Sequence, residues 1–256
     1  MTTSEETVNH QLLRTPGLLI TGTDTDVGKT YITALIAREL TSQGIHVGVY
    51  KPVCTGSFPQ LAGRPGWQDI EELARAIGFV GPDAHICPQR FAAPLAPPVA
   101  ARQEGKSVDA GLLRSGAFWW EGRVDLLLVE GVGGLLSPLT EDESVADLAR
   151  DLGYPLIVVS RLGLGTINHT LMTVEIALKR GLQIAGIILN ETAPAQGGMA
   201  GASNPSEIAQ RCSVPILAIV GYKQPVRERC EDKIDWMSLA RRNVAEKNST
   251  GPRGRE

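Results

Sequence analysis

Short apolar runs recur along the chain, and segments with a helical spacing of apolar residues lie between them. The first run is Leu18-Leu19-Ile20, and the segment Val124–Val129 is nearly continuous in its apolar character. Strands that are apolar at successive positions are typical of a sheet covered on both faces. The predicted strands lie at residues 18–20, 46–50, 124–129, 156–159, 185–189 and 216–220.

The intervening segments predict helices, because their apolar residues recur every three or four positions. Tyr31–Leu40 follows the first strand, and Asp69–Ile77 ends at Gly78, a residue type that commonly closes helices. Pro88–Pro98 is rich in proline and predicts no regular element. This alternation predicts an α/β fold with one domain on a doubly wound, mostly parallel sheet. The other predicted helices lie near residues 108–120, 144–152, 166–180 and 205–212.

Polar segments flank the predicted domain. Residues 1–16 predict a flexible N-terminal extension, and residues 17–222 contain all the predicted strands. Residues 223–256 are rich in Arg, Lys and Glu, which predicts a polar C-terminal tail that is partly disordered.

Composition narrows the classes of protein. The chain has 256 residues, of which 43% are hydrophobic and 21% are charged, which favours a folded domain over disorder. A net charge of −3 argues against a nucleic-acid surface, and no apolar run is long enough to span a bilayer. The N-terminal residues carry no long apolar core of a signal peptide. We therefore expect a soluble, cytoplasmic protein that binds neither nucleic acid nor membrane.

The cysteines and histidines are scattered. No CxxC pair occurs, so the sequence predicts no zinc site and predicts free thiols in a reducing compartment. The cysteines are Cys54, Cys87, Cys212 and Cys230.

The segment Gly22–Thr30 reads Gly-Thr-Asp-Thr-Asp-Val-Gly-Lys-Thr and lies between the first predicted strand and helix. In such a loop the backbone amides and the positive end of the helix face an anion. Lys29 would reach the outer phosphates, and the hydroxyl of Thr30 can hold Mg²⁺. The loop is a variant P-loop, because Thr23 stands where the usual pattern has glycine. It predicts a fold of the P-loop NTPase type that binds a nucleoside triphosphate; the alternative is a chance Gly-Lys-Thr at a helix start.

Polar residues also follow several other predicted strands. In open α/β sheets ligands bind at this edge, so these side chains are candidates for the same site. Lys51 could stabilise developing negative charge, and Glu130 and Asp69 offer the carboxylates that Mg²⁺ prefers. Asn190 could read a base through its amide. Each has a plainer alternative: a surface lysine, an acid in a turn, a helix N-cap and a turn asparagine.

Four segments together resemble one family. They are Gly22–Thr30, Tyr50-Lys51-Pro52-Val53, Val129-Glu130-Gly131-Val132-Gly133-Gly134 and Gly165-Thr166-Ile167-Asn168-His169. In this order and spacing they resemble the dethiobiotin synthetases of biotin biosynthesis, over about residues 18–220.

The resemblance implies an ATP-dependent enzyme that closes the ureido ring of dethiobiotin from 7,8-diaminopelargonic acid and CO₂, with Mg²⁺. It implies that an amine of the substrate takes up CO₂ to form a carbamate. The carbamate then attacks the γ-phosphate, and the second amine closes the ring on the resulting carbamic–phosphoric anhydride and expels phosphate. It also implies a homodimer in which the loop Gly165–His169 completes the partner's substrate site.

The resemblance also implies residue roles. Lys51 and Lys29 would be catalytic, and Thr30, Asp69 and Glu130 would hold the metal. The ATP-binding residues would be Asp26, Val27, Gly28, Lys29, Thr30, Tyr31, Asp69, Glu130, Gly131, Val132, Gly133 and Asn190. The substrate-binding residues would be Thr25, Thr55, Gly165, Thr166 and Asn168. The base contacts after the last strand stay open, because Val220-Gly221-Tyr222 differs from the Gly-Glu-Ile-Pro-like segment that this family often has.

Two other functions fit a variant P-loop. A cobyrinic acid synthetase usually carries a glutaminase domain as well, for which this chain has no room. A partition or septum-positioning ATPase has a second lysine five residues before the P-loop lysine, and Asp24 occupies that position here.

Overall fold

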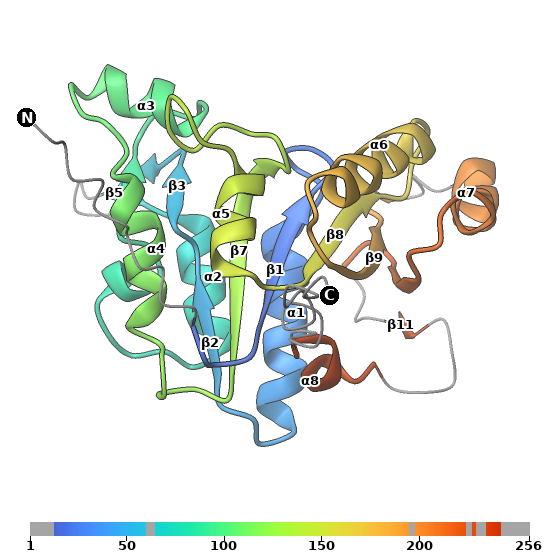
Figure 1. Ribbon diagram of the computed structural model, residues 1–256, viewed down its shortest axis with the longest axis horizontal. Helices are drawn as coiled ribbons and strands as arrows, with labels where there is room; N and C mark the ends of the chain where they lie inside the picture. The colour runs from blue at the N-terminus through green and yellow to red at the C-terminus, as the bar shows by residue number, and fades with distance from the viewer. Residues whose placement is uncertain (1–12, 60–64, 195–197, 224–226, 229–233, 242–256) are drawn as a thin grey trace, which may run out of the picture.

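The computed structural model describes residues 13–59, 65–194, 198–223, 227–228 and 234–241. A seven-stranded sheet forms its centre, in the order β11-β10-β9-β8-β1-β7-β2 (Figure 1). Six strands of this sheet pair in parallel, and the short edge strand β11 is antiparallel to β10. This confirms the predicted α/β fold with a mostly parallel sheet. The strands are β1 (Gly17–Gly22), β2 (Val47–Tyr50), β7 (Leu126–Gly134), β8 (Leu156–Arg161), β9 (Ile184–Asn190), β10 (Ile216–Val220) and β11 (Arg227–Glu228).

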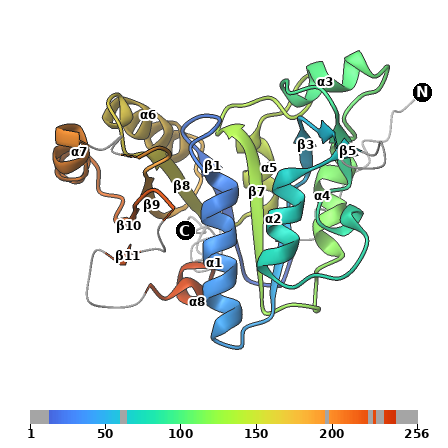
Figure 2. The ribbon, with the colours of Figure 1, turned by 180° about the vertical axis from the view of Figure 1, so that it is seen from behind.

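Helices cover both faces of the sheet. Figure 1 shows α5 and α6 in front of the sheet, and Figure 2, from behind, shows α1 and α2 over the opposite face. The helices lie between the strands in sequence, which gives the doubly wound arrangement. They are α1 (Lys29–Ser42), α2 (Gln68–Ala76), α4 (Ala110–Phe118), α5 (Val145–Leu152), α6 (Thr166–Lys179) and α7 (Gly198–Arg211). No helix in the described ranges is long and apolar enough to cross a bilayer.

The neighbouring strands β1 and β7 show why the apolar runs are continuous. All six residues of β1 are buried, and so are Leu126–Val129 at the start of β7. Burying a Leu or Ile side chain stabilises the fold by about 1.5–3 kcal/mol, so these strands anchor the core. Because β1 pairs with both β7 and β8, the loop that follows β1 lies at the middle of the sheet's carboxyl edge.

The proline-rich stretch 88–98 was expected to hold no regular element, and this prediction is wrong. Its first half contains β6 (Gln89–Phe91), which pairs in parallel with β3 (Val53–Thr55). Its last two prolines open α3 (Pro97–Gln103), where the first helical positions need no backbone N–H. The other short elements are β4 (Phe58–Pro59), β5 (Pro65–Gly66) and the 3₁₀ turn η1 (Asp83–His85).

Two element boundaries also differ from the prediction. Strand β7 continues through Gly134, so Glu130 lies inside the strand and not in a turn after it. Helix α7 begins before the predicted residue 205 and contains Pro205 in its interior. Glycine is unfavourable inside strands and proline inside helices, so the sequence predicts boundaries of β7 and α7 near such residues. Packing against neighbouring elements can nevertheless keep the strand and the helix continuous.

Both flanking segments contain residues that pack against the domain. Leu13 and Thr15 belong to the predicted extension, yet both are buried, and the backbone oxygen of Thr15 accepts a hydrogen bond from Tyr154. In the predicted tail, α8 (Trp236–Leu239) places Trp236 in the core, where its Nε1 donates to Glu39 at 3.1 Å. Residues 1–12 and 242–256 lie outside the described residues.

Candidate functional site

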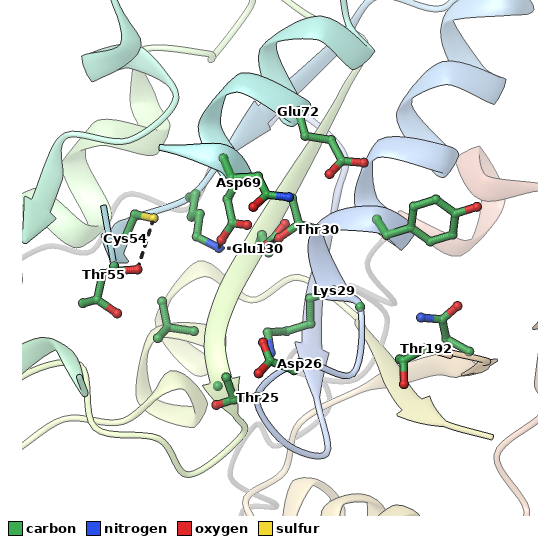
Figure 3. Close-up of a pocket in the computed structure, with 18 of the residues that line it drawn as sticks. Thr25, Asp26, Lys29, Thr30, Cys54, Thr55, Asp69, Glu72, Glu130 and Thr192 are labelled. Carbon is green, nitrogen blue, oxygen red and sulfur yellow. Dashed lines mark hydrogen bonds and ion pairs between the residues drawn. The ribbon is translucent and has the colours of Figure 1, made fainter. Parts of the chain in front are cut away.

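A cavity of about 640 Å³ lies at the carboxyl edge of the sheet, beside the loop after β1 (Figure 3). Its walls come from that loop, from the ends of β2, β7, β9 and β10, and from the start of α2. Most of the predicted site residues therefore meet in one place. Those that line the cavity are Thr25, Asp26, Gly28, Lys29, Thr30, Tyr31, Lys51, Thr55, Asp69, Glu130, Val132, Gly133 and Asn190.

The phosphate loop is shaped by Gly28. This residue precedes α1 with φ of 92°, a left-handed conformation that favours glycine. A Cβ atom there would lie 2.1 Å from Nδ2 of Asn190. That amide nitrogen instead donates to the backbone oxygen of Val27 at 2.9 Å. Only glycine at position 28 leaves room for Asn190, at the end of β9, to bond the backbone of the loop. The free N–H groups of the first turn of α1 then face the cavity, as at other helix N-termini.

Lys29 is the first residue of α1, and its side chain is buried beside the loop. Its Nζ donates to the backbone oxygen of Asp24 at 3.0 Å. Burial lowers the pKa of Lys29 to about 8, and the nearby charge of Glu130 only partly opposes this. A phosphate anion would supply the charge partner that the site lacks, and would therefore favour the protonated lysine.

Lys51 is fixed between two carboxylates. Its Nζ lies 2.5 Å from Oε1 of Glu130 and 2.6 Å from Oδ2 of Asp69, and its side chain is 5% exposed. Burial alone would lower the pKa of Lys51, but the two carboxylates outweigh it and raise the pKa above its ordinary value. Burial would likewise raise the pKa of Asp69, but Lys51 holds it below the ordinary value. The two carboxylates therefore favour the protonated, cationic form of Lys51.

The oxygen atoms around Lys51 fit a magnesium ion. Thr30 Oγ1 donates to Oε1 of Glu130 at 2.7 Å, so hydroxyl and carboxylate oxygens converge from α1, α2 and β7 (Figure 3). Oε2 of Glu130 is buried and has no hydrogen-bond partner among the described residues. Mg²⁺ binds one or two carboxylates together with phosphate and water oxygens. Among the described residues, no group of three His, Cys, Asp or Glu side chains is arranged to hold a metal ion by itself, so such an ion would depend on phosphate oxygens as well.

Some predicted site residues lie elsewhere. Val27 is buried beneath the phosphate loop, and Gly131 is buried in β7, where a Cβ atom would lie 2.9 Å from Val145. Gly165, Thr166 and Asn168 lie at the start of α6 and are not among the described residues that line the cavity. The hydroxyl of Thr166 is buried against Ser160 at 2.8 Å. The hydroxyl of Thr166 is therefore not available to a ligand, and the substrate contact predicted for this segment stays a prediction.

The cavity also contains residues that the sequence analysis missed. Glu72 extends toward the cavity from α2, one turn after Asp69, and Thr192 lies on the opposite side from Thr55 (Figure 3). The spacing from Asp69 to Glu72 could have indicated Glu72, because residues three positions apart share a helix face. The others follow strand ends or lie beside predicted residues. They are Cys54, Gly56, Gln68, Glu191, Tyr222 and Lys223.

Known proteins resemble this chain over most of its length. A family profile described as "AAA domain" matches residues 16–229. A protein of Anaeromyxobacter dehalogenans named "ATP-dependent dethiobiotin synthetase BioD" is 44% identical over 213 residues, which cover 83% of this chain and 93% of that protein. Proteins of the same name from Rhodopirellula baltica and Bacillus licheniformis are 37% and 38% identical, and cover 80% and 79% of this chain and 83% and 84% of their own lengths.

Among solved structures, chloroplast FtsY of Physcomitrella patens has a TM-score of 0.49 and 18% identity, covering 93% of this chain and 67% of that chain. A likeness at that level carries no conclusion about activity. The relatives found by sequence are far more similar, at 44% and 37% identity, and are matched over 93% and 83% of their own lengths. On that similarity, the chain belongs to the family of ATP-dependent dethiobiotin synthetases.

Proposed function

We propose that this chain closes the ureido ring of dethiobiotin from 7,8-diaminopelargonic acid and CO₂, and converts ATP to ADP and phosphate. The observation that supports this most is the meeting of Lys29, Lys51 and the group Thr30, Asp69 and Glu130 in one cavity. A reaction between a carbamate and a triphosphate brings two anions together. Such a reaction needs positive charge fixed between them, which two buried lysines would supply.

In this proposal the phosphate loop binds the triphosphate. The backbone amides of residues 26–30 and the N-terminus of α1 face the phosphates, and Lys29 reaches the β and γ groups. Thr30, Asp69 and Glu130 would hold Mg²⁺, which neutralises phosphate charge when it is bound. Val132 and Gly133 continue β7 beyond Glu130 and line the cavity, so they would border the same phosphates, whereas Gly131 would act only as part of the strand that carries them.

Lys51 acts as a fixed cation at the γ-phosphate. Because its pKa is raised, it stays charged while the carbamate oxygen attacks phosphorus and the bond to ADP breaks. The second amine of the substrate then attacks the carbonyl carbon of the carbamic–phosphoric anhydride. Phosphate leaves with one oxygen that came from CO₂, and the ureido ring closes. Positioning of the two anions accounts for most of the remaining acceleration.

The two ends of the cavity would hold different parts of the reactants. Thr25 in the phosphate loop and Thr55 at the end of β3 line the cavity and offer hydroxyls for the carbamate end of the diamine (Figure 3). At the other end, Oδ1 of Asn190 is buried and has no partner among the described residues. That acceptor suits the exocyclic amine of adenine, and Tyr31 lines the same cavity.

We further propose a homodimer that completes the substrate site at the start of α6. Leu164 is 91% exposed and Met172 on α6 is 56% exposed, which gives this face an apolar character suited to a second copy. Asn168 is exposed on the first turn of α6, beside Gly165, and could bind the tail carboxylate of the partner's substrate. We place the reaction in the cytoplasm, where its co-substrate ATP is made.

The proposal is tested by incubating the protein with MgATP, bicarbonate and 7,8-diaminopelargonic acid, and by measuring phosphate together with the mass of the organic product. We expect phosphate release that requires the diamine, and a product with the mass of dethiobiotin. Omitting each reactant in turn is the control. Phosphate release that is unchanged without the diamine, with no product mass, would refute the proposed reaction.

A further inference from the structure

The phosphate loop is held at both of its ends by side chains from neighbouring strands. Asn190 at the end of β9 holds the backbone oxygen of Val27, close to α1. At the opposite end, the guanidinium of Arg161, the last residue of β8, lies 3.0 Å from Oδ2 of Asp24. Next to it, Ser160 accepts a hydrogen bond from the hydroxyl of Thr23 at 3.2 Å. The loop therefore spans the ends of two strands on one side of β1.

Asp24 connects Arg161 to the lysine of the loop. Its Oδ1 accepts a hydrogen bond from the backbone amide of Thr25 at 2.8 Å. Its backbone oxygen accepts the hydrogen bond from Nζ of Lys29 at 3.0 Å. The position of Asp24 thus influences both the first turn of the loop and the direction of the Lys29 ammonium. Any group that fixes the Asp24 carboxylate acts on the phosphate site through these two bonds.

Charge gives Arg161 a second effect. The loop carries the carboxylates of Asp24 and Asp26 next to the place where a triphosphate would bind. An unpaired carboxylate there would repel the phosphates, and Arg161 neutralises one of the two. Arg161 is not among the described residues that line the cavity, so it acts through Asp24 and not by contact with the nucleotide.

We infer that Arg161 is a positioning residue for the phosphate loop, which holds Asp24 and thereby sets Lys29 for the triphosphate. The inference rests on the proposed function only in that the loop binds ATP. It predicts an effect on binding of the phosphate chain and no direct effect on binding of the diamine. A residue that only stabilised the fold would weaken both.

The test measures equilibrium binding of MgATP and of Mg-tripolyphosphate, and the KM values for ATP and diamine, in four variants. Arg161→Ala is expected to weaken the binding of both polyphosphate ligands by the same factor, about two- to fivefold because the ion pair is partly exposed, and to leave the diamine KM unchanged. Arg161→Lys should keep most of the affinity, because it retains the charge. In protein that already carries Asp24→Asn, adding Arg161→Ala should change the affinity for polyphosphate little further, because the two residues act through the same ion pair.

Arg150→Ala is the matched control, since Arg150 on α5 pairs with Asp147 away from the cavity. Thermal melting of every variant detects loss of folding, and Arg161→Lys decides the question if Arg161→Ala does not fold. Unchanged polyphosphate binding in Arg161→Ala, or fully additive effects of the two substitutions, would overturn the inference. Wild-type protein that binds ATP but makes no dethiobiotin would refute only the proposed reaction. Wild-type protein that does not bind ATP would refute both.

Discussion

The Nζ atom of Lys51 lies 2.5 Å from Oε1 of Glu130, and both side chains are almost completely buried at the carboxyl edge of the sheet. Burying two charges is costly, and a close pair with further hydrogen bonds offsets that cost. Asp69 and Thr30 supply those further contacts. The arrangement keeps a cation and two carboxylates ready at one point of the cavity.

Replacement of Lys51 tests its charge. We expect Lys51→Ala to lower the rate of ring closure by about 10²–10³-fold, because a fixed cation at the developing charge is lost. Binding of MgATP should change far less, because the phosphate loop is intact. Phosphate release and calorimetric ATP binding, measured side by side, separate the two effects. Turnover like that of wild type would remove Lys51 from the chemistry.

The same substitution also leaves Glu130 buried without its charged partner. Breaking a buried pair on one side typically costs about 3–5 kcal/mol, so Lys51→Ala should melt at a lower temperature. MgATP should restore part of that loss by mass action. Activity is therefore compared at a temperature where the melting curve shows both proteins folded.

Glu130→Gln tests the metal site. The amide keeps the size of the side chain but removes the charge, so we expect the apparent affinity for Mg²⁺ to fall by about tenfold or more. A titration of phosphate release against Mg²⁺ at fixed ATP measures this. Glu141→Gln, an exposed carboxylate paired with Arg102, serves as the control. Identical Mg²⁺ curves for all three proteins would show that Glu130 is not a ligand.

Gly28 tests the shape of the phosphate loop, and Gly44, which follows α1, is its matched control. Both have positive φ, but a Cβ at Gly28 would meet Asn190, whereas a Cβ at Gly44 would meet nothing within 4 Å. Either Ala substitution should cost about 1–3 kcal/mol of stability from backbone strain. Only Gly28→Ala should also abolish ATP binding. Equal ATP affinity in the two variants, measured by calorimetry, would contradict the role given to the Gly28–Asn190 contact.

Cys54 lines the cavity, and its reactivity is a further test. Burial raises the pKa of its thiol to about 11, so at pH 8 only about one molecule in a thousand carries the thiolate. Iodoacetamide at pH 8 should label the more exposed Cys212 first, and labelling of Cys54 should accelerate as the pH rises toward 11. Peptide mass spectrometry measures both rates. Fast labelling of Cys54 at pH 8 would mean that the site is more open than described.

Trp236 tests whether the end of the chain belongs to the domain. Its side chain is 1% exposed and hydrogen-bonded to Glu39 on α1. Trp236→Ala should lower the free energy of unfolding by about 3–5 kcal/mol. Val80→Ala, at a side chain that is 99% exposed, should change it by less than about 0.5 kcal/mol. Urea unfolding of both variants gives these values, and equal stabilities would make α8 dispensable.

Sequence patterns predicted the strands of the sheet and most of the residues that line the cavity, because both are set by residues that are neighbours in the chain. Continuous apolar runs mark strands that are covered on both faces, and the residues after them reach one edge of the sheet. This is why Lys51, Glu130 and Asn190 line the same cavity as Lys29, although each alone has an ordinary structural explanation.

Contacts between distant residues could not be predicted in this way. Asn190 holds the backbone of Val27 across 163 positions of sequence, and no local pattern specifies that bond. The pairing of Lys51 with both acids also depends on three separate elements. Trp236 lies in a polar segment, so its burial against α1 depends on tertiary packing and gives no periodic signal.

In the proposed reaction a carbamate oxygen attacks the γ-phosphorus of ATP between Lys29 and Lys51. A rapid single turnover with ¹⁸O-labelled bicarbonate, MgATP and 7,8-diaminopelargonic acid, followed by mass analysis of the released phosphate, follows that oxygen atom. We expect one ¹⁸O atom in each phosphate formed with dethiobiotin. Phosphate that carries no ¹⁸O from bicarbonate, or that has taken its oxygen from solvent water, would rule out attack by the carbamate.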